Sequence, residues 1–469
     1  VRCAIQRPVT HGRSLHVWYT PILQPARYLL GALALLASMA QAADPQIIGP
    51  MPGYSATRAV KLWIQVKHAE QIAIEYWSEG ASTERRRTET RRVVELPEGI
   101  AVFEIGDLTP GMRYRYQVVL DGKTVEPSEP LRFRTQPLWQ WRANPPPFKA
   151  AIGSCNFVND KPADRPGRGY GSEYQIFTAI AQQQPDLMLW LGDNLYLREV
   201  DIDSAWGIAD RYRRVRAFPP LQTLLRSTHH YAIWDDHDFG PNNANGTYVF
   251  KPAVLESFRR YWPNPSYGLP GTPGIFTRFA WHDVEFFLLD NRYYRNSDRA
   301  PNTTDKVMLG KAQLAWLKDA LLSSPATFKV IASGSQLLND VSLAEGWQHF
   351  PAERQNFLDW LAETRVSGVV FLSGDRHRTE LIRYERAGLY PLHELTCSPL
   401  TARARGARDR EADLPNRVAD THVAQRNFCR LDFDGPLNDR QLTLRVFDAD
   451  GEPLWSRMLR ARQLRAPSN

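Results

Sequence analysis

The feature that most constrains the fold is the alternation, after residue 148, of short apolar runs with amphipathic segments. The apolar runs have the length and composition of buried β-strands: KAAIG, DLMLWL, YAIW, EFFLLD, KVIASG and GVVFLSG. Between them lie segments such as KAQLAWLKDALL and RQNFLDWLAET, in which apolar residues recur every three or four positions, as in a helix with one buried face. This alternation predicts an α/β domain with a largely buried sheet.

A different pattern precedes this domain. From Gln46 to about Pro137, short alternating runs such as VKLWIQV and RYRYQVVL are separated by turn residues, which is typical of a small antiparallel sandwich. The stretch LTPGMRYRYQV resembles a late strand of a fibronectin type III-like module. The three successive prolines of QPLWQWRANPPPFK favour an extended linker. We therefore expect an all-β domain over residues 43–137, a Pro-rich linker over 138–148 and the α/β domain over 149–469.

The first 42 residues are predicted to be a signal peptide with an upstream extension. Arg27 precedes the run YLLGALALLASMA, and Ala40 and Ala42 offer small residues for cleavage. The alternative is an uncleaved membrane anchor, but a membrane span would need an apolar run of about 18 residues. We expect a periplasmic or secreted protein with no stable membrane span.

The net charge of +7 is weak evidence for a nucleic-acid partner. Four of the positive charges, Arg2, Arg7, Arg13 and Arg27, lie in the predicted signal segment, which carries no acidic residue. The rest of the chain is therefore only slightly basic, and we expect no specific nucleic-acid partner.

Three cysteines remain if Cys3 is removed with the signal segment. In an oxidising compartment an odd number of thiols needs an explanation. Cys397 and Cys429 could form a disulfide, which would leave Cys155 free. A free Cys155 is either buried and inert or a metal-bound thiolate, and composition alone leaves both open.

Polar groups able to bind metal or phosphate follow the apolar runs. Because the carboxyl ends of the strands in an open α/β sheet form one edge, where ligands bind, we expect these groups to converge. In chain order they are Ser154-Cys155-Asn156, Asp193 with Tyr196, Asp235-Asp236-His237-Asp238, Asp290 with Arg292, and Asp375 with His377.

Convergence of so many acids favours bound cations. Packed carboxylates raise one another's pKa and repel unless a cation lies among them. Each motif also has an ordinary interpretation: Asp193 could start a turn, WDDHD could be a solvated loop or a helix N-cap, and His377 could be a hydrogen-bond partner. Taken together, the oxygen ligands are too many for a closed structural zinc site. Phenolate and carboxylate suit a ferric ion, and the other oxygens suit calcium or another hard divalent ion.

The motifs GSCN, GDNLY, WDDHDFGPNN, LDNRYYR, LGKAQLAWLKDAL and SGDRH, in this order, resemble those of PhoD-type alkaline phosphatases of the metallophosphoesterase superfamily. The resemblance extends from about Ala150 to the end of the chain. It implies a four-layer α/β sandwich, preceded by a small all-β domain, with a site that holds Fe³⁺ and Ca²⁺, or other divalent metals, and hydrolyses phosphate esters.

The resemblance also implies roles for individual residues. Cys155 and Tyr196 would ligate iron, Asp193 would bridge the metals, and His237 would serve as ligand or as proton donor. The catalytic residues would be His237, Arg292 and Arg198, with Asp290 and Arg295 supporting the site. Asn242 is preferred to Asn243 as the asparagine ligand. The full set of implied metal ligands is Cys155, Asp193, Tyr196, Asp236, His237, Asn242, Asp375 and His377.

The predicted function is that of an exported metal-dependent phosphatase. A metal-bound hydroxide would attack the phosphorus of a monoester or diester in line, and the substrates would be small-molecule or lipid phosphate esters. One alternative is a phosphodiesterase or phospholipase D-like activity on lipid or polymer phosphodiesters. Another is a non-catalytic exported binding protein, against which the retained ligand set argues.

Overall fold

The computed structural model describes residues 44–465, apart from residues 82 and 343. The predicted signal peptide and its upstream extension lie outside the described residues. Within the described part of the chain, no helix is long and apolar enough to cross a membrane.

The amino-terminal region is all-β, as predicted. All of its strand pairings are antiparallel, and alternate residues such as Leu62, Ile64, Ile74 and Tyr116 form its core. One sheet has the order β1-β2-β6 and the other β4-β3-β7-β8, with β5 pairing with β3 and β9 with β7. The strands are β1 Gln46–Ser55, β2 Val60–Lys67, β3 Gln71–Ser78, β4 Arg86–Arg87, β5 Arg91–Arg92, β6 Ile100–Ile105, β7 Arg113–Leu120, β8 Lys123–Val125 and β9 Leu131–Arg134.

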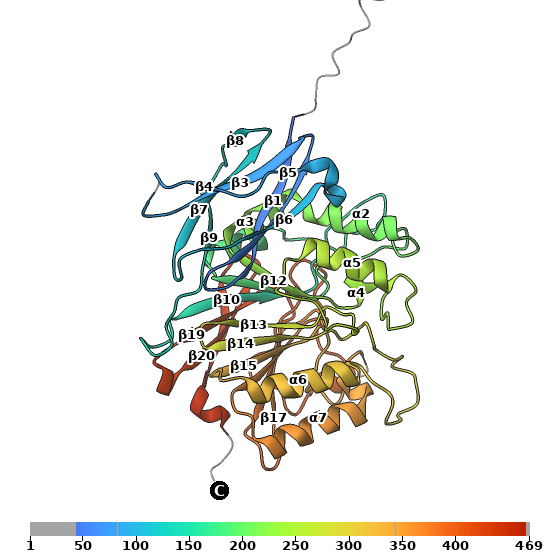
Figure 1. Cartoon of the computed structure of the whole chain (residues 1–469). Helices are drawn as coiled ribbons and strands as arrows, with labels where there is room; N and C mark the ends of the chain where they lie inside the picture. The colour runs from blue at the N-terminus through green and yellow to red at the C-terminus, as the bar shows by residue number, and fades with distance from the viewer. Residues whose placement is uncertain (1–43, 82, 343, 466–469) are drawn as a thin grey trace, which may run out of the picture. The chain divides into compact units, whose positions relative to one another are not determined.

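Two six-stranded sheets form the α/β region (Figure 1). The first has the order β12-β11-β10-β19-β20-β21, and β10, β11 and β12 run parallel. The second has the order β13-β14-β15-β16-β18-β17, with a parallel centre of β14, β15, β16 and β18. The strands are β10 Phe148–Gly153, β11 Leu187–Leu191, β12 His229–Ile233, β13 Thr277–Trp281, β14 Val284–Leu288, β15 Phe328–Ala332, β16 Val369–Ser373, β17 Glu380–Tyr384, β18 Leu392–Thr396, β19 Asn427–Asp434, β20 Gln441–Asp448 and β21 Pro453–Arg460.

Helices occur where the apolar period of three to four residues predicted them. Helices α2 and α5 pack against each other, and α6 and α7 lie together beside the second sheet (Figure 1). The α-helices are α1 Ile176–Gln182, α2 Ala205–Arg216, α3 Gln222–Ser227, α4 Asp236–Phe239, α5 Lys251–Tyr261, α6 Lys311–Ser323 and α7 Pro351–Thr364. The 3-10 helices are η1 Val93–Glu95, η2 Pro97–Gly99, η3 Pro219–Leu221, η4 Trp347–His349, η5 Asp409–Glu411, η6 Leu437–Asp439 and η7 Ala461–Leu464.

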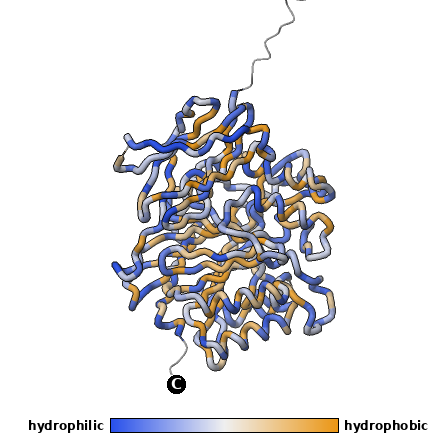
Figure 2. Tube along the Cα trace, viewed as in Figure 1, coloured by the Kyte–Doolittle hydropathy of each residue, from blue (hydrophilic) through white to orange (hydrophobic). Residues whose placement is uncertain are grey.

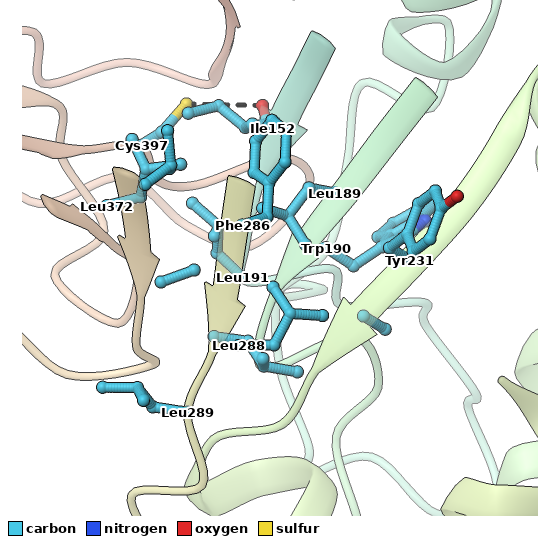
Figure 3. Close-up of a cluster of buried hydrophobic side chains, with 14 of the residues drawn as sticks. Ile152, Leu189, Trp190, Leu191, Tyr231, Phe286, Leu288, Leu289, Leu372 and Cys397 are labelled. Atoms are coloured by element: carbon cyan, nitrogen blue, oxygen red, sulfur yellow. Dashed lines mark hydrogen bonds between the residues drawn. The ribbon is translucent and has the colours of Figure 1, made fainter. Parts of the chain in front are cut away.

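The two large sheets pack face to face around one apolar core. Figure 2 shows apolar residues concentrated along their strands. Tyr231 of β12 stacks on Phe279 of β13 with ring centroids 3.8 Å apart. Figure 3 shows Leu189 and Leu191 of the first sheet beside Phe286 and Leu288 of the second. Burial of these side chains fixes the distance between the sheets, and therefore the positions of the loops at their carboxyl ends.

Cys397 and Cys429, which the sequence left as a possible pair, form a disulfide. Cys397 follows β18 of the second sheet and Cys429 lies in β19 of the first, so the bond joins the two sheets covalently. Cys155 is free and buried.

His229 connects the all-β region to the first large sheet. Its Nδ1 lies 2.8 Å from the carbonyl oxygen of Gly53 in β1, and the Arg134 backbone N–H donates to its Nε2 at 3.2 Å. Burial lowers the pKa of His229 to about 4. The neighbouring His230 accepts from Trp190 Nε1 at Nδ1 (3.0 Å) and lies 3.1 Å from the carbonyl oxygen of Leu224 at Nε2. Both histidines are therefore held in their neutral form.

Acid should destabilise the fold through these histidines. An unfolded histidine takes up a proton below pH 6.5, whereas burial lowers the pKa of folded His230 to about 3. The stability that depends on neutral His230 is therefore complete above pH 6.5 and is lost as the pH falls toward 3. At pH 5 the expected loss from His230 is about 2 kcal/mol of unfolding free energy.

Urea denaturation of the metal-free protein at pH 7.5 and pH 5 measures this loss. His230→Gln should reduce the difference between the two pH values by about 2 kcal/mol. The exposed His68→Asn is the control and should leave the difference unchanged. An equal pH dependence in the native protein and His230→Gln would contradict the assignment.

Candidate metal centre

The polar residues that follow the apolar strands come together at the carboxyl ends of both large sheets. Cys155 follows β10, Asp193 follows β11, Asp236 follows β12, and Asp375 and His377 follow β16. Their potential ligand atoms form three overlapping sets, within each of which all atoms lie within 4.8 Å of one another. The sets are Cys155, Asp193 and His377; Asp193, Asp236 and His237; and Asp235, Asp236 and Asp375.

Cys155 lies at the inner end of this centre. Its Sγ is 3.5 Å from Asp193 Oδ2 and receives a hydrogen bond from Ser398 Oγ at 3.1 Å. Burial, and next the charge of Asp193, raise the pKa of the Cys155 thiol well above its usual range. A thiolate at this position therefore requires a cation close to it.

The ring of His377 is oriented by the protein. Its Nδ1 lies 2.6 Å from the carbonyl oxygen of Arg403, which can only accept, so Nδ1 carries the proton. The lone pair of Nε2 then faces Tyr196 OH, 3.3 Å away. A backbone carbonyl on the far nitrogen is the usual arrangement for a histidine that ligates a metal. Burial lowers the pKa of His377 to about 4, which keeps the ring neutral.

Asp193 belongs to two of the three sets. Its Oδ2 faces Cys155, and its Oδ1 accepts from the backbone N–H of His237 at 3.2 Å. Burial, followed by the charges of Asp236 and Asp235, raises the pKa of Asp193 well above its usual range. Its two oxygens thus face different ligand sets, which is what a bridging carboxylate requires.

Asp235 and Asp236 each offer one free oxygen. Asp236 Oδ2 accepts from the Asn243 backbone N–H at 2.7 Å, and Asp235 Oδ1 accepts from Asn291 at 2.8 Å. Asp236 Oδ1 and Asp235 Oδ2 are buried with no hydrogen-bond partner among the described residues. A buried carboxylate oxygen without a partner is costly, and a cation would satisfy it.

The backbone at this centre is strained. Cys155, Asp193, Asp375 and His377 have φ values of 58°, 51°, 62° and 54°. These lie in the left-handed region, which costs a non-glycine residue about 1–3 kcal/mol and is concentrated at functional sites. The strain occurs at four residues from three loops, all of which belong to the ligand sets.

Arg292 and Asp290 support the centre from behind. Asp290 accepts from Trp234 Nε1 at 2.8 Å and from the Ile275 backbone N–H at 3.0 Å. Arg292 has no exposed surface and donates to Asp235 at 2.6 Å and to both oxygens of Glu345 at 2.8 Å. Arg295, also buried, lies 3.4 Å from Glu345. In this conformation Arg292 therefore holds the WDDHD segment in place and has no free face for a substrate.

A cavity of about 720 Å³ adjoins the ligand sets. Tyr196, His237, Asn242 and Arg198 are among the residues that line it. The side chain of Asn242 is exposed and donates to Asn243. Arg198 lies over the ring of Phe157, with its guanidinium carbon 3.9 Å from the ring centroid. The volume is typical of a pocket for a small molecule.

Comparison with known proteins identifies the family. A family model described as PhoD-like phosphatase matches residues 152–443, more than half of the chain. The chain belongs to the PhoD-like phosphatase family. A second model, described as a domain of unknown function, matches residues 44–138 of this PhoD-like chain.

Individual relatives are distant. Alkaline phosphatase D of Bacillus subtilis (strain 168) is 23% identical over 322 residues, which cover 58% of this chain and 52% of that protein. The chain thus spans about half the length of this curated relative. A solved structure of PhoD is 20% identical with a TM-score of 0.71, covering 88% of each chain. A purple acid phosphatase from yellow lupin is 12% identical with a TM-score of 0.64, covering 90% of this chain and 77% of that one. Both structures confirm the metallophosphoesterase fold.

The donors of this PhoD-like chain fit hard cations. Three overlapping sets rich in carboxylates, together with the two partnerless oxygens of Asp235 and Asp236, require positive charge. The set with Cys155 and His377 adds softer donors and lies against the Tyr196 phenol. This donor set suits a transition metal beside a harder divalent ion.

Several residues at this PhoD-like centre were not foreseen as part of it. Asp235 was recognised within WDDHD but not proposed as a ligand. Ser398, Tyr170 and Glu345 lie in loops whose sequence gives no periodic or motif signal. The segment 401–427 is charged and aperiodic, which predicts a surface loop. It is only partly exposed, because Glu411 is 8% exposed and accepts from Arg376 at 2.7 Å. The position of Glu411 beside the site follows from the tertiary fold alone.

Proposed function

We propose that this chain hydrolyses phosphate esters, monoesters or diesters, with the help of bound metal ions. The observation that carries the proposal is the convergence of three ligand sets, linked through Asp193 and Asp236, beside a cavity lined by His237 and Tyr196. Membership of the PhoD-like phosphatase family supports it.

Two kinds of metal position are proposed. Cys155, Tyr196 and His377, with Asp193, would hold Fe³⁺. Asp193, Asp236 and Asp375, with Asn242, would hold Ca²⁺ or another divalent ion, and Asp235 joins this group. When bound, the ions would neutralise charge on the phosphate oxygens and activate water for in-line attack.

His237 is the residue best placed to assist the departing oxygen. Its side chain is 22% exposed and lines the cavity, whereas the carboxylates around it are buried. Its Nε2 lies 3.9 Å from Asp236 Oδ2, so the ring stands beside a carboxylate of the ligand sets. We propose that His237 donates a proton to the leaving oxygen.

For Arg198 and Arg292 we propose positioning roles. Each guanidinium directs all three nitrogens to protein acceptors, which for Arg198 are Asp164 and the carbonyl oxygens of Tyr196 and Val158. A guanidinium that binds phosphate needs free donors. A catalytic role of either arginine through direct contact with phosphate would therefore require a change of conformation.

Export and the segment boundaries stay proposals. The disulfide between Cys397 and Cys429 supports an oxidising compartment, such as the periplasm or the exterior. We propose an all-β domain over 43–137, a linker over 138–148 and a metallophosphatase domain over 149–469.

A metal-depletion experiment tests the proposed function. Chelation of the purified protein should abolish hydrolysis of 4-nitrophenyl phosphate and bis(4-nitrophenyl) phosphate, and Fe³⁺ with Ca²⁺ should restore it. Ferric iron bound to the Tyr196 phenolate should give a violet colour, which Tyr196→Phe should remove. Elemental analysis of the untreated protein supplies the metal content.

The two readouts separate two kinds of failure. Full activity after verified removal of all metal would contradict the proposed reaction. A colourless, iron-free and fully active enzyme would contradict the iron assignment to Cys155 and Tyr196 and leave hydrolysis intact.

A further inference from the structure

Three arginines near the candidate metal centre lack a carboxylate partner. These arginines are Arg168, Arg403 and Arg405, and all three are exposed. None of them forms an ion pair with another described residue. Two acids near them, Glu199 in the lining of the first cavity and Glu173 in the chain after Arg168, are already used. Glu199 pairs with Arg165 at 2.5 Å, and Glu173 pairs with Arg426 at 2.8 Å. The positive charge at this position is therefore not neutralised by any carboxylate among the described side chains.

Tyr170 connects two of these arginines to the centre. Its hydroxyl accepts from Arg405 Nη2 at 2.8 Å and lies 3.4 Å from His377 Nδ1. The guanidinium of Arg403 lies over the Tyr170 ring, 5.6 Å from its centroid. Arg405 and His377 thus contact the same hydroxyl oxygen, and Arg403 contacts the ring that carries it. The backbone of the same segment is fixed, because Arg403 O accepts from His377 Nδ1 and the Arg405 N–H donates to His377 O at 2.8 Å.

A second cavity continues outward from the first. It has a volume of about 500 Å³, and Arg168 and Gly169 line both cavities. Arg403 lines the second cavity and Arg405 the first. The unpaired arginines therefore lie along a path that leads from the metal centre to the second cavity.

We propose that Arg168 and Arg403 form a subsite for a second anionic group of the substrate. This inference rests on the proposed function, since the scissile phosphate would lie at the metal centre. The preferred substrates are phosphate esters whose organic part carries a further phosphate or carboxylate a few bonds away. Arg405, anchored on Tyr170, stands between the two anionic positions.

The physical basis is charge complementarity at a partly enclosed surface. Guanidinium groups bind phosphate and carboxylate through paired N–H donors, and an arginine without an acidic partner keeps these donors free. Exposed charges contribute modestly, so we expect about a fivefold gain in affinity for each arginine. An uncharged organic group would gain nothing from this subsite.

Binding measurements on the metal-loaded protein test the subsite without turnover. Calorimetry would compare butylphosphonate with 1,4-butanediphosphonate and 5-phosphonopentanoate, which add a second phosphonate or a carboxylate at the far end. The native protein should bind at least one of the two probes that carry a second anionic group about tenfold or more tightly than butylphosphonate. The relative affinities of the two probes show which anionic group the subsite prefers.

The variant Arg168→Ala/Arg403→Ala should reduce that preference to about one. Arg408→Ala, which removes an exposed arginine of the same loop, should retain it. No preference in the native protein, or a preference that survives in the double variant, overturns the subsite. Hydrolysis of aryl phosphates is measured separately on the native protein. A native protein that hydrolyses them but shows no preference refutes the subsite alone, and one that shows the preference but no hydrolysis refutes the proposed function.

Discussion

Asp193→Asn should lower kcat/KM for an aryl phosphate by about 10³-fold, the upper range for removal of one electrostatic contact at a reaction centre. The substitution keeps the shape of the side chain and the acceptor for the His237 N–H, but removes the negative charge shared by two ligand sets. Metal content should fall with activity, because one carboxylate serves both sets. Kinetics and elemental analysis of the same preparation measure both effects.

The control distinguishes loss of ligation from loss of folding. Asp203→Asn removes an exposed carboxylate from the loop beside the cavity and should keep activity within about twofold. Metal-free Asp193→Asn should unfold at no lower temperature than the metal-free native protein, since it buries one charge fewer. Near-native activity of Asp193→Asn would show that the reaction takes place elsewhere.

The position of the centre was accessible from the sequence because it follows from strand order. Short apolar runs identify buried strands, and residues immediately after parallel strands reach the same edge of a sheet. Cys155, Asp193, Asp236 and His377 all satisfy this rule, and the structure brings them together. The centre contains residues from both large sheets. The rule applies to both, because the carboxyl ends of their parallel strands meet at this centre.

The remaining parts of the site depend on long-range contacts that no local pattern encodes. Glu345 lies far along the chain from Arg292, yet its carboxylate is one of the two that neutralise this guanidinium. Tyr170 and Ser398 reach the centre from irregular loops, whose paths are set by packing. The sequence also could not decide whether Asn242 or Asn243 is the asparagine ligand. The two side chains are identical and differ only in the direction that the backbone gives them.

Arg292→Met should lower the unfolding free energy of the metal-free protein by about 3–5 kcal/mol, the usual cost of leaving buried charges without a partner. The Arg292 guanidinium is fully buried and pairs with Asp235 at 2.5 Å and Glu345 at 2.8 Å. Burial acts to lower the pKa of Arg292, but these carboxylates outweigh it and raise the pKa well above its usual range. Its removal leaves two acids inside the protein, and both must be protonated or hydrated.

Urea denaturation of three variants measures this coupling. The double variant Arg292→Met/Glu345→Gln should recover part of the loss, because one of the two stranded charges is then absent. Arg58→Met is the matched control: it breaks a pair whose side chains are 67% and 75% exposed, and should cost less than about 1 kcal/mol. A cost below 1 kcal/mol for Arg292→Met would mean that the WDDHD segment is held by its other contacts without Arg292, and the positioning role proposed for Arg292 would then be wrong.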